Sequence, residues 1–267
     1  MIRTPAVAHQ FYPGDAHTLQ LLLAQLVPAG VAARPARAVI MPHAGYVYSG
    51  RVAGETVARV EVPEDLIVLG PNHHGLGAPA ALMAAGTWRM PGGDVEINAE
   101  LAAEILRHCP EVQDDSRAHL AEHSLEVLVP FLQYRQPRLT IVPLCLARLD
   151  YPVCRLIGLG LAAAGRNFLR PVMLAASTDM SHYESRARAS AKDQLAIERV
   201  LALDPEGLYQ TVAANRISMC GVIPTVITLI AALEAGATRA ELVRYTDSGE
   251  TSGDLDQVVG YAGFILS

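Results

Sequence analysis

The sequence contains no cluster of lysine and arginine residues, and acidic residues outnumber basic ones. Its formal net charge is −6 at pH 7 and its pI is about 5.8. Binding to the phosphate backbone of nucleic acids requires a basic face. The charge therefore argues against a nucleic-acid partner.

Long apolar runs are also missing. The longest apolar stretch lies near Val222–Leu233, which is shorter than the roughly 20 residues that a membrane span needs. The N-terminal segment MIRTPAVAHQFYPGD lacks the apolar core of a signal peptide. We therefore expect a soluble, cytoplasmic protein without a membrane partner.

Several common catalytic signatures are absent. The sequence has no GxSxG elbow, no GxxxxGK[ST] loop and no GxGxxG after a strand, so typical α/β-hydrolases, P-loop proteins and dinucleotide-binding proteins are excluded. The cysteines form no CxxC pair, and we expect all of them to be reduced. They are Cys109, Cys145, Cys154 and Cys220.

The composition is that of a globular protein. The 267 residues are 51% hydrophobic and 18% charged, and the mean hydropathy is +0.24. A chain of this length can bury a substantial core. Because no repeat, linker or low-complexity tract interrupts it, we expect a single domain over residues 1–267.

A short stretch, Leu66–Gly75 (LIVLGPNHHG), is the most informative part of the chain. Leu66–Leu69 is too short for a helix and precedes turn-forming residues, so it is predicted to be a strand buried on both faces. Polar residues follow directly. In an open α/β sheet, ligands bind in the crevice beyond the carboxyl ends of the strands.

The rest of the pattern alternates strands and helices, which predicts an α/β helix–sheet–helix sandwich with a mostly parallel central sheet. We expect Ala78–Ile97 to be an edge hairpin or a lid, and Glu122–Tyr134 to be a helix that Pro130 kinks. Further strands are expected at Ala38–Met41, Thr140–Leu144, Val172–Ala176, Leu242–Tyr245 and Val258–Leu266. Further helices are expected after Asp15 and over Val52–Val60, Ala99–His108, Pro152–Ala163, Arg186–Leu203, a segment starting at Asp204, and Ile223–Ala235.

Three of the predicted strands each end close to a histidine: His43, His73 and His182. If these strands are parallel neighbours, the three imidazoles lie on one edge of the sheet. Imidazole is the commonest metal ligand in proteins, so the pattern favours a metal site. One histidine alone would more simply satisfy loop carbonyls. Of the adjacent pair His73 and His74, only one is expected to face the site.

Other residues near these segments have two readings. Cys220 precedes an apolar helix, whose N-terminal dipole stabilises a thiolate, although a lone cysteine can also be a small core residue. Asp179 either orients His182 or caps a turn. Glu122 and His123 open a helix or reach the site. We expect the remaining histidines to be solvated, namely His9, His17, His108 and His119.

Several segments in this order resemble the Memo family, which in bacteria and archaea is labelled AmmeMemoRadiSam system protein B. They are FYPGD (Phe11–Asp15), MPHAGYVYSG (Met41–Gly50), LGPNHHG (Leu69–Gly75), EHSLEVLVPFLQ (Glu122–Gln133), IVPL (Ile141–Leu144), STDMSHY (Ser177–Tyr183) and MCGVIP (Met219–Pro224). The resemblance implies a fold like that of the class III extradiol dioxygenases, and AMMECR-type and radical-SAM proteins as functional neighbours.

The resemblance also implies roles for individual residues. It assigns His43, His73 and Cys220 as metal ligands, and His182 as an acid or base. The dioxygenases use a carboxylate where this chain has Cys220, and a His₂Cys set also suits copper or zinc. Function must therefore be argued from the site and not from the fold.

The leading hypothesis is a metal-dependent oxidoreductase of dioxygenase type that uses iron or copper. His182, oriented by Asp179, would move a proton of an aromatic or phenolic substrate. The substrate pocket would be lined by Tyr46, His74, Glu122 and His123. One alternative is a non-catalytic metal-binding or peptide-binding protein. Another is a zinc hydrolase, which needs Glu122 as its general base.

Overall fold

A twisted sheet of twelve strands forms the centre of the computed structural model, which describes residues 1–267. Along the sheet the order is β1-β5-β6-β8-β3-β9-β2-β12-β10, while β11 pairs with β12, and β4 joins β7 to β8. The strands are β1 (Ile2–Arg3), β2 (Ala38–Met41), β3 (Asp65–Pro71), β4 (Ala80–Leu82), β5 (Thr87–Trp88), β6 (Val95–Ile97), β7 (Gln113–Asp114), β8 (Thr140–Leu146), β9 (Val172–Ser177), β10 (His182–Glu184), β11 (Ala240–Asp247) and β12 (Val258–Leu266).

Four neighbouring strands, β8, β3, β9 and β2, are parallel to one another. Nearly all of their residues are buried, as expected of strands covered on both faces. Their carboxyl ends share one edge of the sheet, from which the loops after Met41, Pro71 and Ser177 leave. This confirms that the three histidine-bearing loops leave the same edge.

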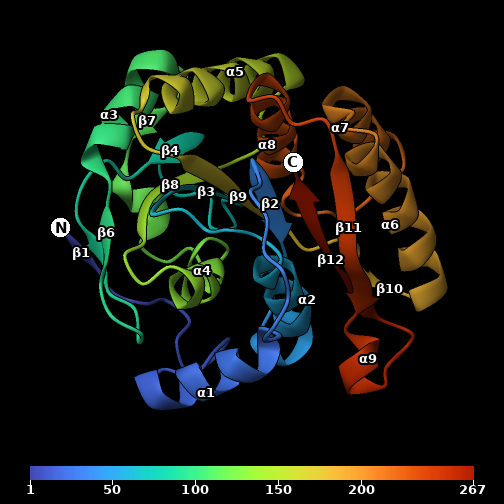
Figure 1. Cartoon of the computed structure of the whole chain (residues 1–267). Coiled ribbons are helices and arrows are strands. Elements are labelled where there is room, and N and C mark those ends of the chain that lie inside the picture. The colour runs from blue at the N-terminus through green and yellow to red at the C-terminus, as the bar shows by residue number, and fades with distance from the viewer.

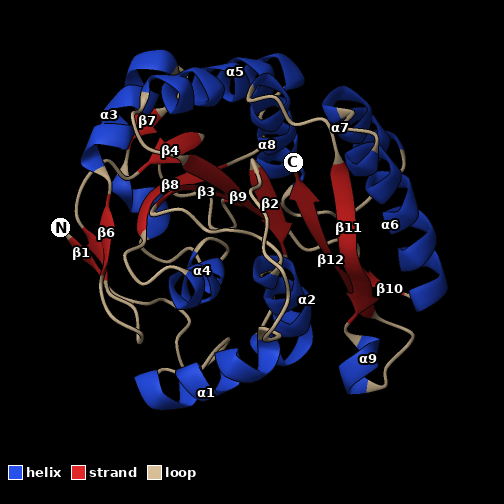
Figure 2. Cartoon of the chain, viewed as in Figure 1, coloured by secondary structure: helices blue, strands red, loops and turns tan.

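Helices cover both faces of the sheet, as Figures 1 and 2 show. They are α1 (Ala16–Leu26), α2 (Tyr46–Ala58), α3 (Ala99–His108), α4 (Val129–Arg135), α5 (Tyr151–Asn167), α6 (Arg186–Leu201), α7 (Pro205–Ala214), α8 (Val222–Glu234) and α9 (Gly249–Ser252). One apolar core lies between the sheet and α3, α5, α6, α7 and α8, and a second lies between the sheet and α1, α2 and α4. The predicted sandwich is confirmed.

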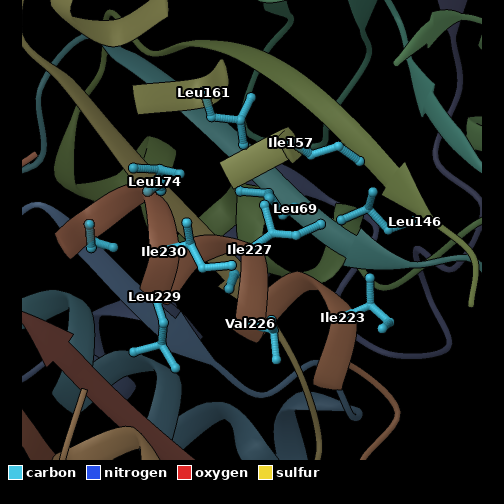
Figure 3. Packing of buried hydrophobic residues seen from close by; sticks show 14 of the residues in the cluster. Leu69, Leu146, Ile157, Leu161, Leu174, Ile223, Val226, Ile227, Leu229 and Ile230 are labelled. Carbon is cyan, nitrogen blue, oxygen red and sulfur yellow. The ribbon is translucent and has the colours of Figure 1, made fainter. Parts of the chain in front are cut away.

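Successive strand residues enter opposite cores. Ile40 lies in the first core, whereas Val39 lies in the second, because side chains alternate along a strand. Figure 3 shows Ile227 of α8 packed beside Leu69 of β3 within the first core. Each such fully buried aliphatic side chain stabilises the fold by about 1.5–3 kcal/mol. No helix is both long and apolar enough to cross a bilayer.

Most predicted elements are confirmed, with end points shifted by a few residues. The side chains of Asp15, Asn98 and Asp204 cap α1, α3 and α7, respectively. The Ala78–Ile97 segment forms an antiparallel β5–β6 hairpin near one edge of the sheet, together with β4. The hairpin reading of this segment is therefore correct.

Two predicted helices differ. α2 begins at Tyr46 and not at Val52, since Gly50 lies inside the helix and does not interrupt it. A Cβ on Gly54 would lie 2.1 Å from the Leu26 carbonyl oxygen, so glycine allows α1 and α2 to approach. Pro130 does not kink a long helix. It occupies the first turn of α4, where a main-chain N–H would have no partner within the helix, so proline is tolerated there.

The expectation that His119 is solvated is wrong. Its side chain is 1% exposed, and its Nε2 bonds the Ala81 carbonyl at 3.0 Å. Its Nδ1 is buried without a partner. Burial lowers the pKa of His119 to about 4, because a charged imidazolium would lose its hydration.

This burial predicts how stability depends on pH. Unfolded His119 takes up a proton below its ordinary pKa of about 6.5, whereas folded His119 stays neutral down to about pH 4. The folded state therefore loses up to about 3 kcal/mol of stability as pH falls from about 6.5 to about 4. Urea denaturation of wild type and His119→Gln across this range gives the free energy of unfolding at each pH. The wild-type value should fall more steeply with falling pH than that of the variant. An equal pH dependence in the two proteins would contradict the prediction.

Candidate metal centre

Three imidazoles meet at the carboxyl edge of the parallel strands. His43 follows β2, His73 follows β3, and His123 comes from the turn that precedes α4. One ligand nitrogen of each lies within 4.8 Å of those of the other two, and the rings of His73 and His123 stack with centroids 4.6 Å apart. The cluster therefore contains two of the three histidines chosen from the strand pattern, with His123 in place of His182.

His43 is held in one tautomer by a chain of hydrogen bonds. The Ser177 hydroxyl donates to the Ser124 carbonyl at 2.6 Å, so its oxygen accepts from His43 Nδ1, also at 2.6 Å. In the neutral ring, Nε2 then carries a free lone pair. Burial, together with His73 nearby, lowers the pKa of His43 to about 3. His43 is therefore an unprotonated nitrogen donor at neutral pH.

His73 is oriented by a buried carboxylate. Its Nδ1 lies 2.9 Å from Glu122 Oε1, and its main-chain N–H donates to Oε2 at 2.6 Å. A carboxylate only accepts hydrogen bonds, so Nδ1 carries the proton and Nε2 is free to bind a ligand. Pairing of this kind between a carboxylate and a histidine is typical of the surroundings of bound metal ions.

Glu122 is saturated by its donors. Besides the two bonds from His73, its Oε1 accepts the main-chain N–H groups of His123 and Ser124. Burial alone would raise its pKa, but the bonds from His73 and Ser124 outweigh burial and lower the pKa to about 2. An ionised carboxylate with its oxygens engaged is a poor general base. Glu122 thus orients the site and does not line the cavity, contrary to its predicted place in the pocket.

Cys220 contacts His43 but is not part of the compact cluster of three imidazoles. Its Sγ is 3.4 Å from His43 Nε2 and accepts the Asp179 main-chain N–H at 3.3 Å. Burial, followed by the charge of Asp179, raises the pKa of the thiol. In this form of the protein, burial therefore outweighs the helix dipole that was expected to favour the thiolate. A cation placed between Cys220 and His43 would have to displace the thiol proton.

Asp179 and His182 have different hydrogen-bond partners. Asp179 Oδ1 accepts the main-chain N–H of His43 at 2.9 Å, and burial raises the pKa of Asp179. His182 is oriented by Ser218, whose carbonyl lies 2.9 Å from Nδ1 and whose hydroxyl accepts the His182 N–H. Asp179 thus positions the His43 loop. The expected Asp179–His182 pair is replaced by Ser218.

A cavity of about 500 Å³ opens over the imidazoles, and we call it the histidine cavity. His43, His73, His123, Asp179 and His182 line it, together with Phe11, Tyr48 and Tyr261. Tyr46, predicted to line the pocket, is instead buried, with its hydroxyl bonded to the Val127 carbonyl at 2.8 Å. His74 is exposed and lies beside Glu122 and His123 outside the cavity.

A buried arginine fixes the turn that carries Glu122 and His123. Arg3 donates to the carbonyls of His119 and Glu122, each at 2.6 Å, and pairs with Glu126 at 2.7 Å. Glu126 also accepts from the Tyr12 hydroxyl at 2.6 Å. No local sequence pattern indicates this network, because Arg3 and Tyr12 lie more than a hundred residues from the side of it that the turn provides, His119, Glu122 and Glu126. Ser177 could have been singled out from the sequence, because it is a polar residue at the carboxyl end of a buried apolar strand.

Comparisons with known proteins agree with this architecture. Residues 3–265 match the family model described as Memo-like protein. A MEMO1 family protein of Methanopyrus kandleri is 42% identical over 100% of this chain and 99% of its own. Another, of Aquifex aeolicus, is 40% identical over 99% of each chain. A solved structure of an uncharacterized Escherichia coli K12 protein has a TM-score of 0.53 at 15% identity, covering 84% of this chain and 98% of that one; it shows the fold alone.

The Arg3 network makes a prediction about stability. Arg3→Met leaves the carboxylate of Glu126 buried without its cation, which typically costs about 3–5 kcal/mol. Arg51→Met is the matched control, because Arg51 is exposed and lies 3.0 Å from half-buried Glu55, and a surface pair of this kind is worth about 0–1 kcal/mol. Urea denaturation measures both. Equal losses for the two variants would show that the network does not stabilise the fold.

Proposed function

The chain belongs to the Memo family, and on that premise we propose that it is a metal-dependent oxidoreductase of dioxygenase type that acts on a phenolic substrate. One observation carries the proposal. The Nδ1 atoms of His43 and His73 are each engaged by a protein acceptor, which leaves both Nε2 atoms unprotonated, that of His43 in contact with the Cys220 thiol. Ligand nitrogens of these two rings lie within 4.8 Å of each other. Two preorganised imidazole donors favour a transition metal over calcium or magnesium.

The third ligand has two candidates. Cys220, assigned from the family resemblance, lies 3.4 Å from His43 Nε2. His123 belongs to the compact cluster with His43 and His73, and burial lowers its pKa to about 4, so it is neutral near pH 7. A thiolate would suit copper, zinc or iron, and a third imidazole would suit the same ions. We propose Cys220 as the ligand and His123 as a wall of the substrate cavity.

A bound iron or copper ion would supply the redox chemistry with oxygen that the protein side chains lack. The chain itself supplies a base. His182 lines the histidine cavity, and its Nδ1 is committed to the Ser218 carbonyl, so Nε2 of the neutral ring can accept the proton of a phenol. Phe11 packs edge-on against His123 with ring centroids 5.0 Å apart, which gives an aromatic substrate an apolar wall.

Two alternatives use the same residues. Zinc-dependent hydrolysis is disfavoured, because Glu122, the acid closest to His73, has its oxygens occupied by donors. A non-catalytic metal-binding or peptide-binding protein would keep the ligands without turnover. Oxygen consumption separates this second alternative from the proposal.

Metal content tests the ligand set. His43→Ala and His73→Ala are expected to abolish stoichiometric binding of iron or copper, measured by elemental analysis of protein purified and loaded without oxygen. Glu122→Gln should weaken binding about 10–100-fold, because His73 loses its orienting carboxylate. His17→Gln, at an exposed position, is the control and should bind like wild type. Unchanged metal content in His43→Ala would refute the site.

The same measurement identifies the third ligand. Cys220→Ser should lower metal affinity at least tenfold, whereas His123→Gln should leave it near the wild-type value. The reverse result would assign His123 in place of Cys220.

His182→Gln tests the proposed base. The variant should retain its metal yet consume oxygen with catechols about 10²–10⁴-fold more slowly, because a general base contributes on that order. The measurement is oxygen uptake by metal-loaded wild type and variant. If metal-loaded wild type consumes no oxygen with any catechol, the oxidoreductase is refuted and the non-catalytic alternative stands.

A further inference from the structure

A second cavity, of about 560 Å³, adjoins the metal-binding residues from the other side. It lies at the same edge of the sheet, where β8 ends, and its wall continues along α7 and the start of α8. His73 and Cys220 line it, together with Arg148 and Arg216, and we call it the arginine cavity. A volume of this size is within the range of small-molecule sites.

The wall of the arginine cavity is mostly apolar. Leu146 at the end of β8 and Ile223 in the first turn of α8 contribute to it, and Figure 3 shows both at the margin of the first core. Val212, Ile217 and Met219 extend this wall. Such a surface favours the flat or branched hydrocarbon part of a ligand over a sugar or an extended polar chain.

The charges in this cavity have one sign. Arg148 and Arg216 are both exposed, and neither guanidinium forms a hydrogen bond or ion pair within the chain, whereas Arg3, Arg170 and Arg186 are each paired with a carboxylate. No aspartate or glutamate lines the cavity. The first turn of α8, which forms part of the wall, has no acidic residue either, and its free N–H groups add positive potential.

The turn that carries Arg216 is itself fixed. Arg216 adopts a φ of 50°, which is uncommon for a residue with a side chain, and its carbonyl accepts a hydrogen bond from Lys192 Nζ at 3.2 Å. The side chain of Arg216 is thus presented from a defined position at the end of α7.

From these observations we propose that the arginine cavity binds an aromatic carboxylate. The carboxylate pairs with Arg148 and Arg216, since a guanidinium matches a carboxylate with two parallel hydrogen bonds. The ring lies on the Leu146 and Ile223 wall, and its far end points toward His73 and Cys220. This inference goes beyond the proposed function, because it assigns a second site, for an aromatic carboxylate, apart from the histidine cavity in which the phenolic substrate meets His182.

Binding of two matched probes to metal-free protein tests the inference. 3,4-Dihydroxybenzoate and catechol differ only in the carboxylate, and isothermal titration calorimetry measures their affinities. We expect 3,4-dihydroxybenzoate to bind wild type at least tenfold more tightly. The double variant Arg148→Gln/Arg216→Gln should reduce its affinity to that of catechol, since each hydrogen bond to a charged group typically changes affinity by about tenfold or more.

Arg135→Gln is the matched control, because Arg135 is also exposed and unpaired but lies at the end of α4, outside the arginine cavity. It should bind both probes like wild type. Equal affinity of wild type for the two probes would overturn the inference, as would an equal loss in the control. Tighter binding of phenyl phosphate than of 3,4-dihydroxybenzoate would overturn the choice of a carboxylate.

The test also separates this inference from the proposed function. If wild type binds metal but does not prefer 3,4-dihydroxybenzoate over catechol, only the proposed ligand of the arginine cavity is refuted. Absence of metal binding, with the carboxylate preference retained in metal-free wild type and in His43→Ala, supports the arginine cavity and refutes the metal centre alone.

Discussion

The buried carboxylate of Glu122 is the interaction on which the geometry of the site depends. It joins two loops that are distant in sequence, because it accepts bonds from both His73 groups and from the N–H groups of His123 and Ser124. Ser124 in turn receives the Ser177 hydroxyl, which holds His43. One anion therefore connects the loops after β2, β3 and β9. Burying it is tolerable only because its charge is met by several donors.

A second set of buried contacts, made by Arg3, holds the main chain around Glu122 in place. Arg3 holds the Glu122 carbonyl, stacks over the Trp88 ring at 4.1 Å and neutralises Glu126. The edge of the sheet that carries the histidine cluster is thus held in place by the N-terminal segment, while the strands supply only the starting points of the loops. This division suits a site whose ligands must stay in one rotamer before an ion arrives.

Much of the fold followed from local patterns in the sequence. Apolar runs that end in turn residues located β2, β3 and β9, and capping residues located the starts of α1, α3 and α7. The parallel order then placed His43 and His73 at one edge. His123 was expected to line the pocket, as it does, but its cluster with His43 and His73 was not predicted. That cluster, the partner of His182 and the burial of His119 each depend on contacts between residues far apart in sequence. Cys220 shows the same limit: its helix position was visible, but the burial that raises its pKa was not.

The position of β12 affects how the protein is made. Ile40 of β2 pairs with Phe264 of β12, so a ribosome produces one half of this pairing long before the other. Until β12 emerges, one edge of β2 presents unpaired main-chain N–H and C=O groups, the kind of edge that recruits foreign strands. The nascent chain therefore passes through an interval in which chaperone capture competes with aggregation, and slow pairing of such distant segments lengthens that interval.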